Sequence, residues 1–226
     1  MGIYKSNNEG AIGIGALIIF IAMVLVAGIA ASVIIQTSNT LESRSSAVGR
    51  ETTREVGSGI TIFSIEAYAA TGSDISRLAI LVRPRAGSKA VDLTHTYIEI
   101  SDKNVKSVLN YTSANYSEPD GLDDIFSADV YPDDNYGYHH TMNTDGSRYG
   151  LLVLDDPDSS MSRDAPLLTR GDKVYLCINT TGVFNDVAEN TELWGQVIPE
   201  IGYSARIDIR TPYTYADNVM ELFWDM

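Results

Sequence analysis

The first quarter of the chain changes from polar to wholly apolar and back to polar. Residues 11–35 form a run of 25 uncharged, mostly apolar residues, and no charged residue occurs between Glu9 and Glu42. At 1.5 Å per residue, a helix over this run is about 37 Å long and exceeds a bilayer core of about 30 Å. The run is also longer than the apolar part of an ordinary secretory signal, which has about 7–15 residues. The pattern therefore predicts an apolar helix that needs lipid or other helices around it.

The polar stretch that follows is predicted to continue the same helix. Leu41, Val48 and Val56 recur at spacings of seven and eight residues, which suits a narrow apolar stripe. Gly57 comes directly after this stripe, and glycine commonly ends a helix. We therefore expect one helix from residue 11 to about residue 56, within a segment 11–58 whose first half is apolar and whose second half is polar.

Small residues recur at four-residue spacing inside the apolar run, as in the pair Gly28 and Ser32. Such spacing lets the backbones of neighbouring helices approach closely. Ile21 lies near the middle of the run, where a charged substitution should abolish packing between helices. The positions expected to pack against other helices are Ala11, Gly15, Ile21, Ala27, Gly28, Ala31 and Ser32.

From residue 60 onward, short runs rich in Val, Ile, Tyr and Leu are separated by Gly, Asp, Asn and Pro. Several runs alternate with period two, as in Leu78, Ile80 and Val82, which is typical of half-buried strands. Many short strands without intervening helices indicate an antiparallel β-sandwich, so the fold class is α+β. The expected strands are 60–69, 75–84, 96–101, 105–111, 126–131, 150–155, 172–179, 195–199 and 203–209, with a loop-rich region over 112–149.

Composition excludes several classes of function. The formal charge of −14 and the pI near 4.4 argue against nucleic acid, because binding a phosphate backbone requires clustered Lys and Arg. A single cysteine, Cys177, excludes an intrachain disulfide and cysteine-cluster metal sites. With only three histidines, the chain has few imidazole ligands for a metal site. It also contains neither the GxSxG motif of serine hydrolases nor the GxxxxGK[ST] phosphate-binding loop. We expect no enzyme activity, no cofactor and no metal centre.

Three Asn-x-Ser/Thr sequons could carry N-linked glycans if this part of the chain is extracellular. They begin at Asn110, Asn115 and Asn179. Such a short motif also arises by chance, so the alternative is three unmodified asparagines in turns.

Acidic residues dominate residues 118–164, where 12 Asp and Glu accompany only Arg148 and Arg163. Carboxylates in such numbers can bind a hard cation such as calcium, and Asp155, Asp156 and Asp158 form one candidate set. No EF-hand spacing is present, so we expect a solvated acidic surface in preference to an ion site.

The leader and several blocks resemble one protein family. The ten-residue leader MGIYKSNNEG, followed directly by the apolar run, resembles the class III signal peptides of archaeal flagellins (archaellins) and type IV pilins. Four further blocks resemble archaellins in the family's order: VGSGI (56–60), LAILVRPRAGSKAVDLTHTYIEISD (78–102), LTRGDKVYLCINTTGVF (168–184) and GQVIPEIGYSARIDIRTPYTY (195–215).

The resemblance implies a division of the chain into three parts. Residues 1–10 would be removed by a prepilin-type signal peptidase that cuts between Gly10 and Ala11. Residues 11–58 would form the core of a helical filament, and residues 59–226 an outer immunoglobulin-like β-sandwich. The function implied is that of a structural subunit of the archaeal flagellum filament, which serves swimming.

The resemblance also implies partners and a location. The partners are other copies of the chain and other archaellins, a membrane assembly platform and a motor. The precursor would be held transiently in the membrane, and the filament would lie outside the cell.

Two alternatives keep the same apolar helix. A type IV pilin-like adhesion subunit would bind surfaces and retract, but many pilins carry Glu at the fifth position after cleavage, where this chain has Gly15. A monotopic, membrane-anchored envelope protein would keep its N-terminus uncleaved. A bare membrane anchor does not require the polar second half of the helix, whereas a filament subunit does.

Overall fold

The computed structural model describes residues 8–70, 74–118, 124–127 and 146–224. The chain divides into two compact units, residues 1–52 and residues 53–226. Most of the first unit is helix, and the second contains all of the strands. Each unit is described separately below.

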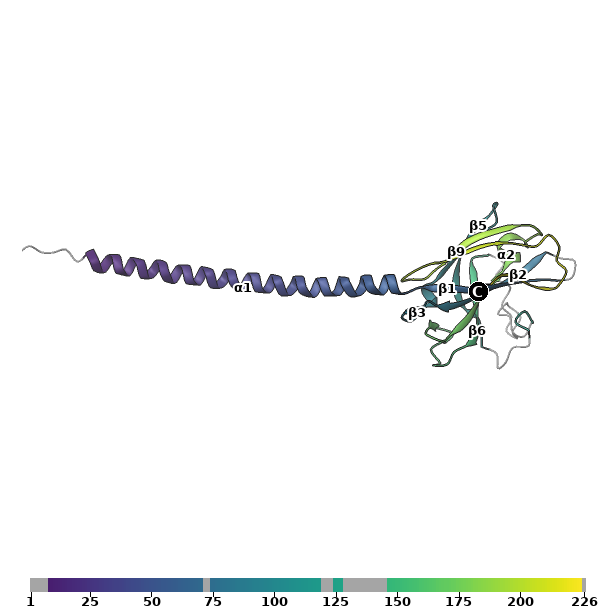
Figure 1. Ribbon diagram of the computed structural model, residues 1–226, viewed down its shortest axis with the longest axis horizontal. Coiled ribbons are helices and arrows are strands. Elements are labelled where there is room, and N and C mark those ends of the chain that lie inside the picture. Colours follow the sequence, from purple (N-terminus) through teal and green to yellow (C-terminus); the bar gives the residue numbers. More distant parts are fainter. Residues whose placement is uncertain (1–7, 71–73, 119–123, 128–145, 225–226) are drawn as a thin grey trace, which may run out of the picture. The chain divides into compact units, whose positions relative to one another are not determined.

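Helix α1 runs without interruption from Asn8 to Gly57 (Figure 1). The predicted helix from residue 11 to about residue 56 is therefore confirmed, and it begins three residues earlier than expected. Just past its end, the Ser58 amide still donates to the Arg54 carbonyl at 2.9 Å. The glycine at position 57 is the last helical residue, as glycine's role in helix termination suggests.

Eleven strands and two short helices are described after α1. The strands are β1 (Ile60–Ala69), β2 (Ile75–Pro84), β3 (Val91–Asp92), β4 (Tyr97–Ser101), β5 (Lys106–Ser117), β6 (Arg148–Asp155), β7 (Leu167–Leu168), β8 (Lys173–Asn179), β9 (Glu192–Ile198), β10 (Ala205–Arg210) and β11 (Val219–Trp224). The helices are the 3₁₀ turn η1 (Leu93–His95) and α2 (Thr180–Phe184).

Nine of these strands form one sheet in the order β10-β9-β4-β5-β6-β8-β2-β1-β11, and β3 pairs with β7 separately. All pairings are antiparallel except that of β5 with β6, which is parallel. The expectation of a purely antiparallel structure is wrong at this pair. Residues 118–147 connect the two strands, and a connection of this length allows the chain to return to the same end of the sheet.

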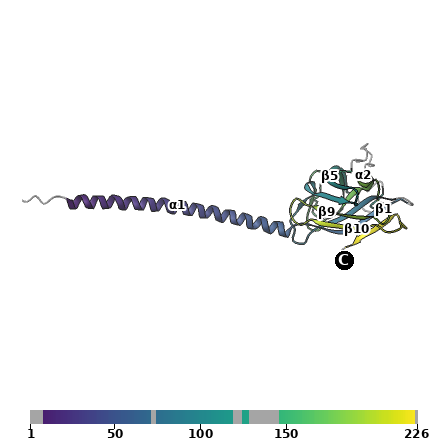
Figure 2. The ribbon, with the colours of Figure 1, turned by 90° about the horizontal axis from the view of Figure 1, so that it is seen from above.

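The sheet folds over on itself, so that β9 and β5 lie in one layer and β1 and β2 in another (Figures 1 and 2). Contacts just before β1 and β10 draw the two layers together. Gly59 bridges Tyr203, and the Ile60 amide donates to the Tyr203 carbonyl at 3.2 Å. Gly59 has φ +152, and a Cβ there would overlap Tyr203, so the close approach requires glycine. The expected sandwich is confirmed in a barrel-like form.

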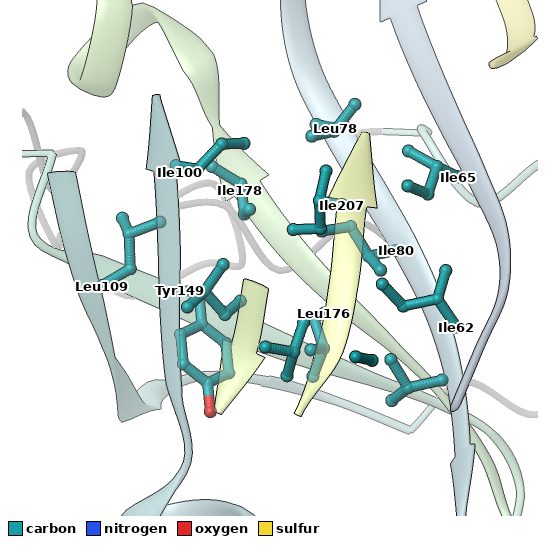
Figure 3. Close-up of a cluster of buried hydrophobic side chains, with 14 of the residues drawn as sticks. Ile62, Ile65, Leu78, Ile80, Ile100, Leu109, Tyr149, Leu176, Ile178 and Ile207 are labelled. Atoms are coloured by element: carbon teal, nitrogen blue, oxygen red, sulfur yellow. The ribbon is translucent and has the colours of Figure 1, made fainter. Parts of the chain in front are cut away.

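The core lies between the layers and is built from the inward-facing side chains of the alternating strands. Figure 3 shows Ile207 of β10 beside Ile80 and Leu176 of the opposite layer, with Tyr149 at one end. All four side chains are almost completely buried. The Tyr149 hydroxyl is satisfied because it donates to the carbonyls of Leu93 and Thr96 at 3.1 and 3.0 Å.

A second, smaller cluster covers the other face of β2, β6 and β8. Phe126 is buried there, stacks on Tyr68 with ring centroids 5.6 Å apart, and accepts a 2.7 Å hydrogen bond from Arg77 through its carbonyl. Cys177 of β8 is also buried in this cluster, as a thiol.

Several sequence-based boundaries require correction. Residues 126–127 form a turn and bend that packs on the sheet, and residues 128–131 of the expected strand lie outside the described residues. Strand β5 continues to Ser117, six residues beyond its expected end. The sequence analysis did not predict α2, β11 or the pair of β3 with β7.

Candidate functional site

The apolar half of α1 has no partner inside the chain. Every described side chain of this half is exposed except Gly15, which is intermediate. Among the described residues, α1 is the one helix that is long and apolar enough to cross a membrane, over Gly10–Gly57. An exposed surface of this size is unfavourable in water at about 25 cal/mol per Å², so the helix requires lipid or protein around it.

The predicted packing positions follow this exposed surface. Ala11, Ile21, Ala27, Gly28, Ala31 and Ser32 are all exposed. A Cβ added at Gly13, Gly15 or Gly28 would meet no atom outside the helix within 4 Å. The fold of the single chain therefore does not require glycine at these positions, although glycine costs about 1 kcal/mol relative to alanine in a helix.

Hydroxyl groups mark the end of the apolar half. Thr37 donates to the carbonyl of Val33 at 2.7 Å, and Thr40 donates to the carbonyl of Gln36 at 2.9 Å. These bonds satisfy the hydroxyls within the helix, so the two threonines can enter an apolar environment at low cost.

The predicted cleavage bond, between Gly10 and Ala11, lies in the first turn of α1. Residues 1–7 of the leader lie outside the described residues. The structure therefore places the bond at the beginning of the helix, before the apolar segment.

The three sequons differ in their environment. Asn110 is exposed on β5, and Asn115 is half-buried where the pairing of β5 with β6 is irregular. Asn179 is the N-cap of α2, where its Oδ1 accepts from the amides of Thr181 and Gly182 at 3.1 and 3.4 Å. The side chain of Asn179 is thus already committed to a structural role.

Three acidic side chains converge beside β7. One carboxylate oxygen from each of Asp156, Asp158 and Asp172 lies within 4.8 Å of the others. Ser160 donates its amide to Asp156 and Asp158 at 3.0 and 3.1 Å, and its hydroxyl to Asp172 at 3.3 Å. Oxygen ligands in such a cluster suit a divalent cation such as calcium.

Asp172 has an unusual environment within this acidic cluster, which comprises Asp156, Asp158 and Asp172. It is 1% exposed, and its Oδ1 has no hydrogen-bond partner among the described residues. Burial raises its pKa above the ordinary value, and the charges of Asp156 and Asp158 raise it further. By contrast, the hydrogen bond from the Thr169 hydroxyl lowers the pKa of Asp158. A cation would neutralise the cluster and complete the coordination of the buried oxygen.

The acidic cluster agrees only in part with the sequence-based candidate set. Asp155 is exposed and pairs with Lys173 at 3.5 Å, outside the cluster. The exposure of Asp155 fits the solvated surface expected over residues 118–164, whereas the buried Asp172 lies beyond that range and was not selected from the sequence. The acidic residues at positions 120, 123, 129, 133, 134 and 145 lie outside the described residues.

His95 is the one histidine among the described residues, and it belongs to no cluster like that of Asp156, Asp158 and Asp172. His95 is exposed and lies 3.2 Å from the Asp92 carboxylate across η1. His139 and His140 lie outside the described residues.

Comparison with known proteins identifies the family. The family model of archaeal-type flagellin matches residues 10–209. The chain is 39% identical to flagellin B3 of Methanocaldococcus jannaschii over 221 residues, covering 97% of this chain and 98% of that protein. It is 36% identical to flagellin B3 of Methanococcus voltae over 236 residues, with coverage of 97% and 98%.

Solved structures agree with this assignment. The crystal structure of archaeal flagellin FlaB1 from Methanocaldococcus jannaschii is similar with a TM-score of 0.63 and 30% identity, covering 73% of this chain and 96% of that one. The archaeal flagellum of Methanospirillum hungatei has a TM-score of 0.61 and 16% identity, covering 92% and 98%, and so shares the fold. The chain, with its long apolar helix and its folded-over sheet, belongs to the archaeal-type flagellin family.

Proposed function

We propose that this chain is a structural subunit of the archaeal flagellum filament and that the apolar half of α1 forms the filament core. The observation that carries the proposal is that the apolar half of α1 is exposed in this chain, which belongs to the archaeal-type flagellin family. A helix that is apolar on all sides is stable only when it is surrounded. Other copies of the same helix would surround it in a filament.

Processing would precede assembly. The leader of residues 1–10 would hold the precursor inactive, with the helix stored in the membrane. A prepilin-type signal peptidase would then cut between Gly10 and Ala11. Support comes from the place of this bond in the first turn of α1, directly before the apolar run of residues 11–35.

Assembly would exchange lipid contacts for contacts between helices. Lipid is already apolar, so close packing would favour association more than the hydrophobic effect would. Gly15 and Gly28 support this step, because the space beside them is open in the single chain. Once the helix has left the membrane, water would oppose its dissociation from the filament. The chain has no phosphate-binding loop, so a membrane assembly platform and a motor would supply energy and rotation.

The second unit would form the outer, hydrated layer of the filament outside the cell. Its acidic surface would keep neighbouring filaments apart through repulsion. The sequons at Asn110, Asn115 and Asn179 would be exposed to N-glycosylation during export. Asn110 is the best placed of the three because it is exposed on a strand.

Substitution of Ile21 tests the role of the helix. Ile21 is exposed in the middle of the apolar half, so Ile21→Asp leaves the fold of the second unit intact. A buried, unpaired carboxylate in the packed core would cost several kcal/mol, so we expect loss of filaments in electron micrographs and loss of swimming. Ile21→Leu is the matched control and should assemble normally. Normal numbers of Ile21→Asp filaments would refute the helical core.

Deletion of the gene separates swimming from adhesion. A filament subunit for swimming predicts non-motile cells that recover when the gene is restored. Cells that swim normally but attach poorly to surfaces would favour the pilin-like alternative.

A further inference from the structure

One surface of the second unit is partly apolar and exposed. It is formed by the outward side chains of β4, β5 and β9, here called the outer β4–β5–β9 face. Its members are Tyr97, Glu99, Val108, Asn110, Trp194, Gln196 and Ile198, which share one side of the sheet by their register. Tyr97, Val108 and Trp194 are large apolar side chains that remain exposed there.

Asn110 lies on this face directly opposite Tyr97. The two residues are partners in the antiparallel pairing of β4 with β5, and directly opposite residues have Cβ atoms about 4.5–5.5 Å apart. Tyr97 is 44% exposed and Asn110 is also exposed. On its other side Tyr97 pairs with Ile198 of β9, which is half-buried. Asn110 thus has two large cross-strand partners, Tyr97 of β4 and the exposed Arg148 of β6, and Tyr97 is the aromatic one.

The side chain of Asn110 is also free to react. This side chain forms no hydrogen bond with any residue in the described part of the chain, whereas the backbone of Asn110 pairs with β4 and its amide donates to the Ser147 carbonyl at 2.9 Å. Asn179 differs, because its Oδ1 caps α2 and the Thr181 hydroxyl of its sequon donates to Asp186. The folded structure thus distinguishes an available sequon from one that is held in a helix cap.

We propose that an N-linked glycan on Asn110 packs its first sugar on the ring of Tyr97, so that Tyr97 is a glycan-docking residue. The inference rests on the proposed N-glycosylation of this chain. In that step the Asn110 Nδ2 forms a bond to the anomeric carbon of a lipid-phosphate-linked oligosaccharide while the bond from that carbon to the phosphate oxygen breaks. The lipid phosphate leaves with the electron pair of the broken bond, and the proton lost from Nδ2 passes to water.

The chemistry of the two groups is complementary. A sugar ring has an apolar face of C–H groups and a polar edge of hydroxyls, and a tyrosine ring has a negative face and a polar hydroxyl. The covalent bond to Asn110 makes the contact intramolecular, so its effective concentration is high. Docking would cover Tyr97, hold β4 and β5 together from outside and stabilise the second unit.

The test is a double-substitution cycle on filaments sheared from cells that produce the chain. Peptide mapping by mass spectrometry first establishes whether Asn110 carries an oligosaccharide. Calorimetry then gives the unfolding temperature of the unaltered protein, Tyr97→Thr, Asn110→Gln and the double variant. Threonine keeps a strand-forming residue at an exposed position, so the fold is retained. If Asn110→Gln yields no filaments, the cycle is run on detergent-extracted subunits.

We expect Tyr97→Thr to lower the unfolding temperature by about 2–4 °C more with Asn110 glycosylated than in the Asn110→Gln background. Tyr97→Phe keeps the ring and should retain most of the stabilisation. Tyr213→Thr is the matched control, because Tyr213 is 71% exposed and lies on none of the three strands of this face. Its effect should be the same in both backgrounds.

Two results would overturn the inference, and they are distinguishable. An unmodified Asn110 would overturn it together with the proposed glycosylation at this site. A glycosylated Asn110 with equal losses from Tyr97→Thr in both backgrounds would overturn the docking role alone and leave the glycosylation intact.

Discussion

At the scale of single residues, Asp172 shows how tertiary structure changes the meaning of a sequence pattern. Its carboxylate is buried beside Asp156 and Asp158, which are 16 and 14 positions earlier in the chain. The sequence analysis found the acidic run that ends at residue 164, but Asp172 lies in a Gly-containing turn beyond it. Only the return of the chain beside β7 brings the three carboxylates together. No local spacing rule could have selected this residue.

The raised pKa of Asp172 predicts a response to substitution and to calcium. Because the folded chain holds this proton more tightly than the unfolded chain, stability falls as pH rises from the ordinary value of about 3.9 to the raised one. At neutral pH the charge is therefore destabilising. Asp172→Asn should raise the unfolding temperature by about 2–4 °C in a chelating buffer.

With calcium present, the unaltered protein should become more stable than Asp172→Asn. At ten times its dissociation constant, a bound cation adds about 1.4 kcal/mol to the stability of the unaltered protein. Asp172→Asn should respond much less, because it removes a ligand oxygen charge from the acidic cluster. Calorimetry with and without calcium measures both effects. If calcium leaves the unfolding temperature of the unaltered protein unchanged, the acidic cluster is not a cation site.

Buried tyrosines predict a loss of stability in alkali. Burial raises the pKa of Tyr149 far above its ordinary value of about 10. Below pH 10 this group is neutral in both the folded and the unfolded chain, so its full contribution to the free energy of unfolding is present. Above pH 10 only the unfolded chain ionises, which lowers stability by about 1.4 kcal/mol per pH unit from this residue alone.

Denaturation curves between pH 8 and pH 11.5, with tyrosinate absorbance recorded in parallel, measure this loss. Tyr149→Phe should be less stable at pH 8, because the hydrogen bonds to Leu93 and Thr96 are lost, but less sensitive to alkali. A stability that stays constant up to pH 11.5 would contradict the buried environment of the hydroxyl.

At the scale of elements, alternation of apolar and polar positions predicted the central strands. β2 and β8 were predicted from alternating apolar positions and pair with each other in the middle of the sheet. The positions between these, such as Ala79 and Cys177, are buried as well, so both strands are buried on two faces and the expectation of half-buried strands is wrong for them. The pattern gave no sign of the parallel pairing of β5 with β6, because alternation reports burial and carries no information on direction. The five-residue helix α2 was missed because it is too short for helical periodicity, and its N-cap Asn179 also fits a sequon.

The apolar half of α1 predicts that added volume interferes with assembly at particular positions. A Cβ added at Gly28 meets no atom outside the helix within 4 Å, and leucine has a higher helix propensity than glycine. Gly28→Leu should therefore keep the helix intact in detergent micelles by circular dichroism, yet form few or no filaments, because backbones could no longer approach closely.

Val26→Leu is the matched control, since it adds a single methylene group at an exposed position that is already large. It should assemble at nearly the normal level. Equal assembly of Gly28→Leu and Val26→Leu would show that Gly28 does not lie where helices meet.

At the scale of the whole molecule, charge and hydrophobicity are divided between the two units. Residues 56–226 contain 12 basic and 26 acidic residues and so account for the whole formal charge of −14. Residues 11–55 are net neutral, and their charged side chains all follow residue 41. This division suits a subunit whose apolar helix associates while its acidic unit remains in water.

The central claim is that the apolar helix becomes the N-terminus of an assembled subunit. Mass spectrometry of the N-terminal peptide from filaments sheared without detergent tests it most directly. We predict a peptide that begins at Ala11 in material that sediments as filaments. An intact Met1, recovered only from detergent-extracted membranes, would contradict the account and favour a membrane-anchored protein.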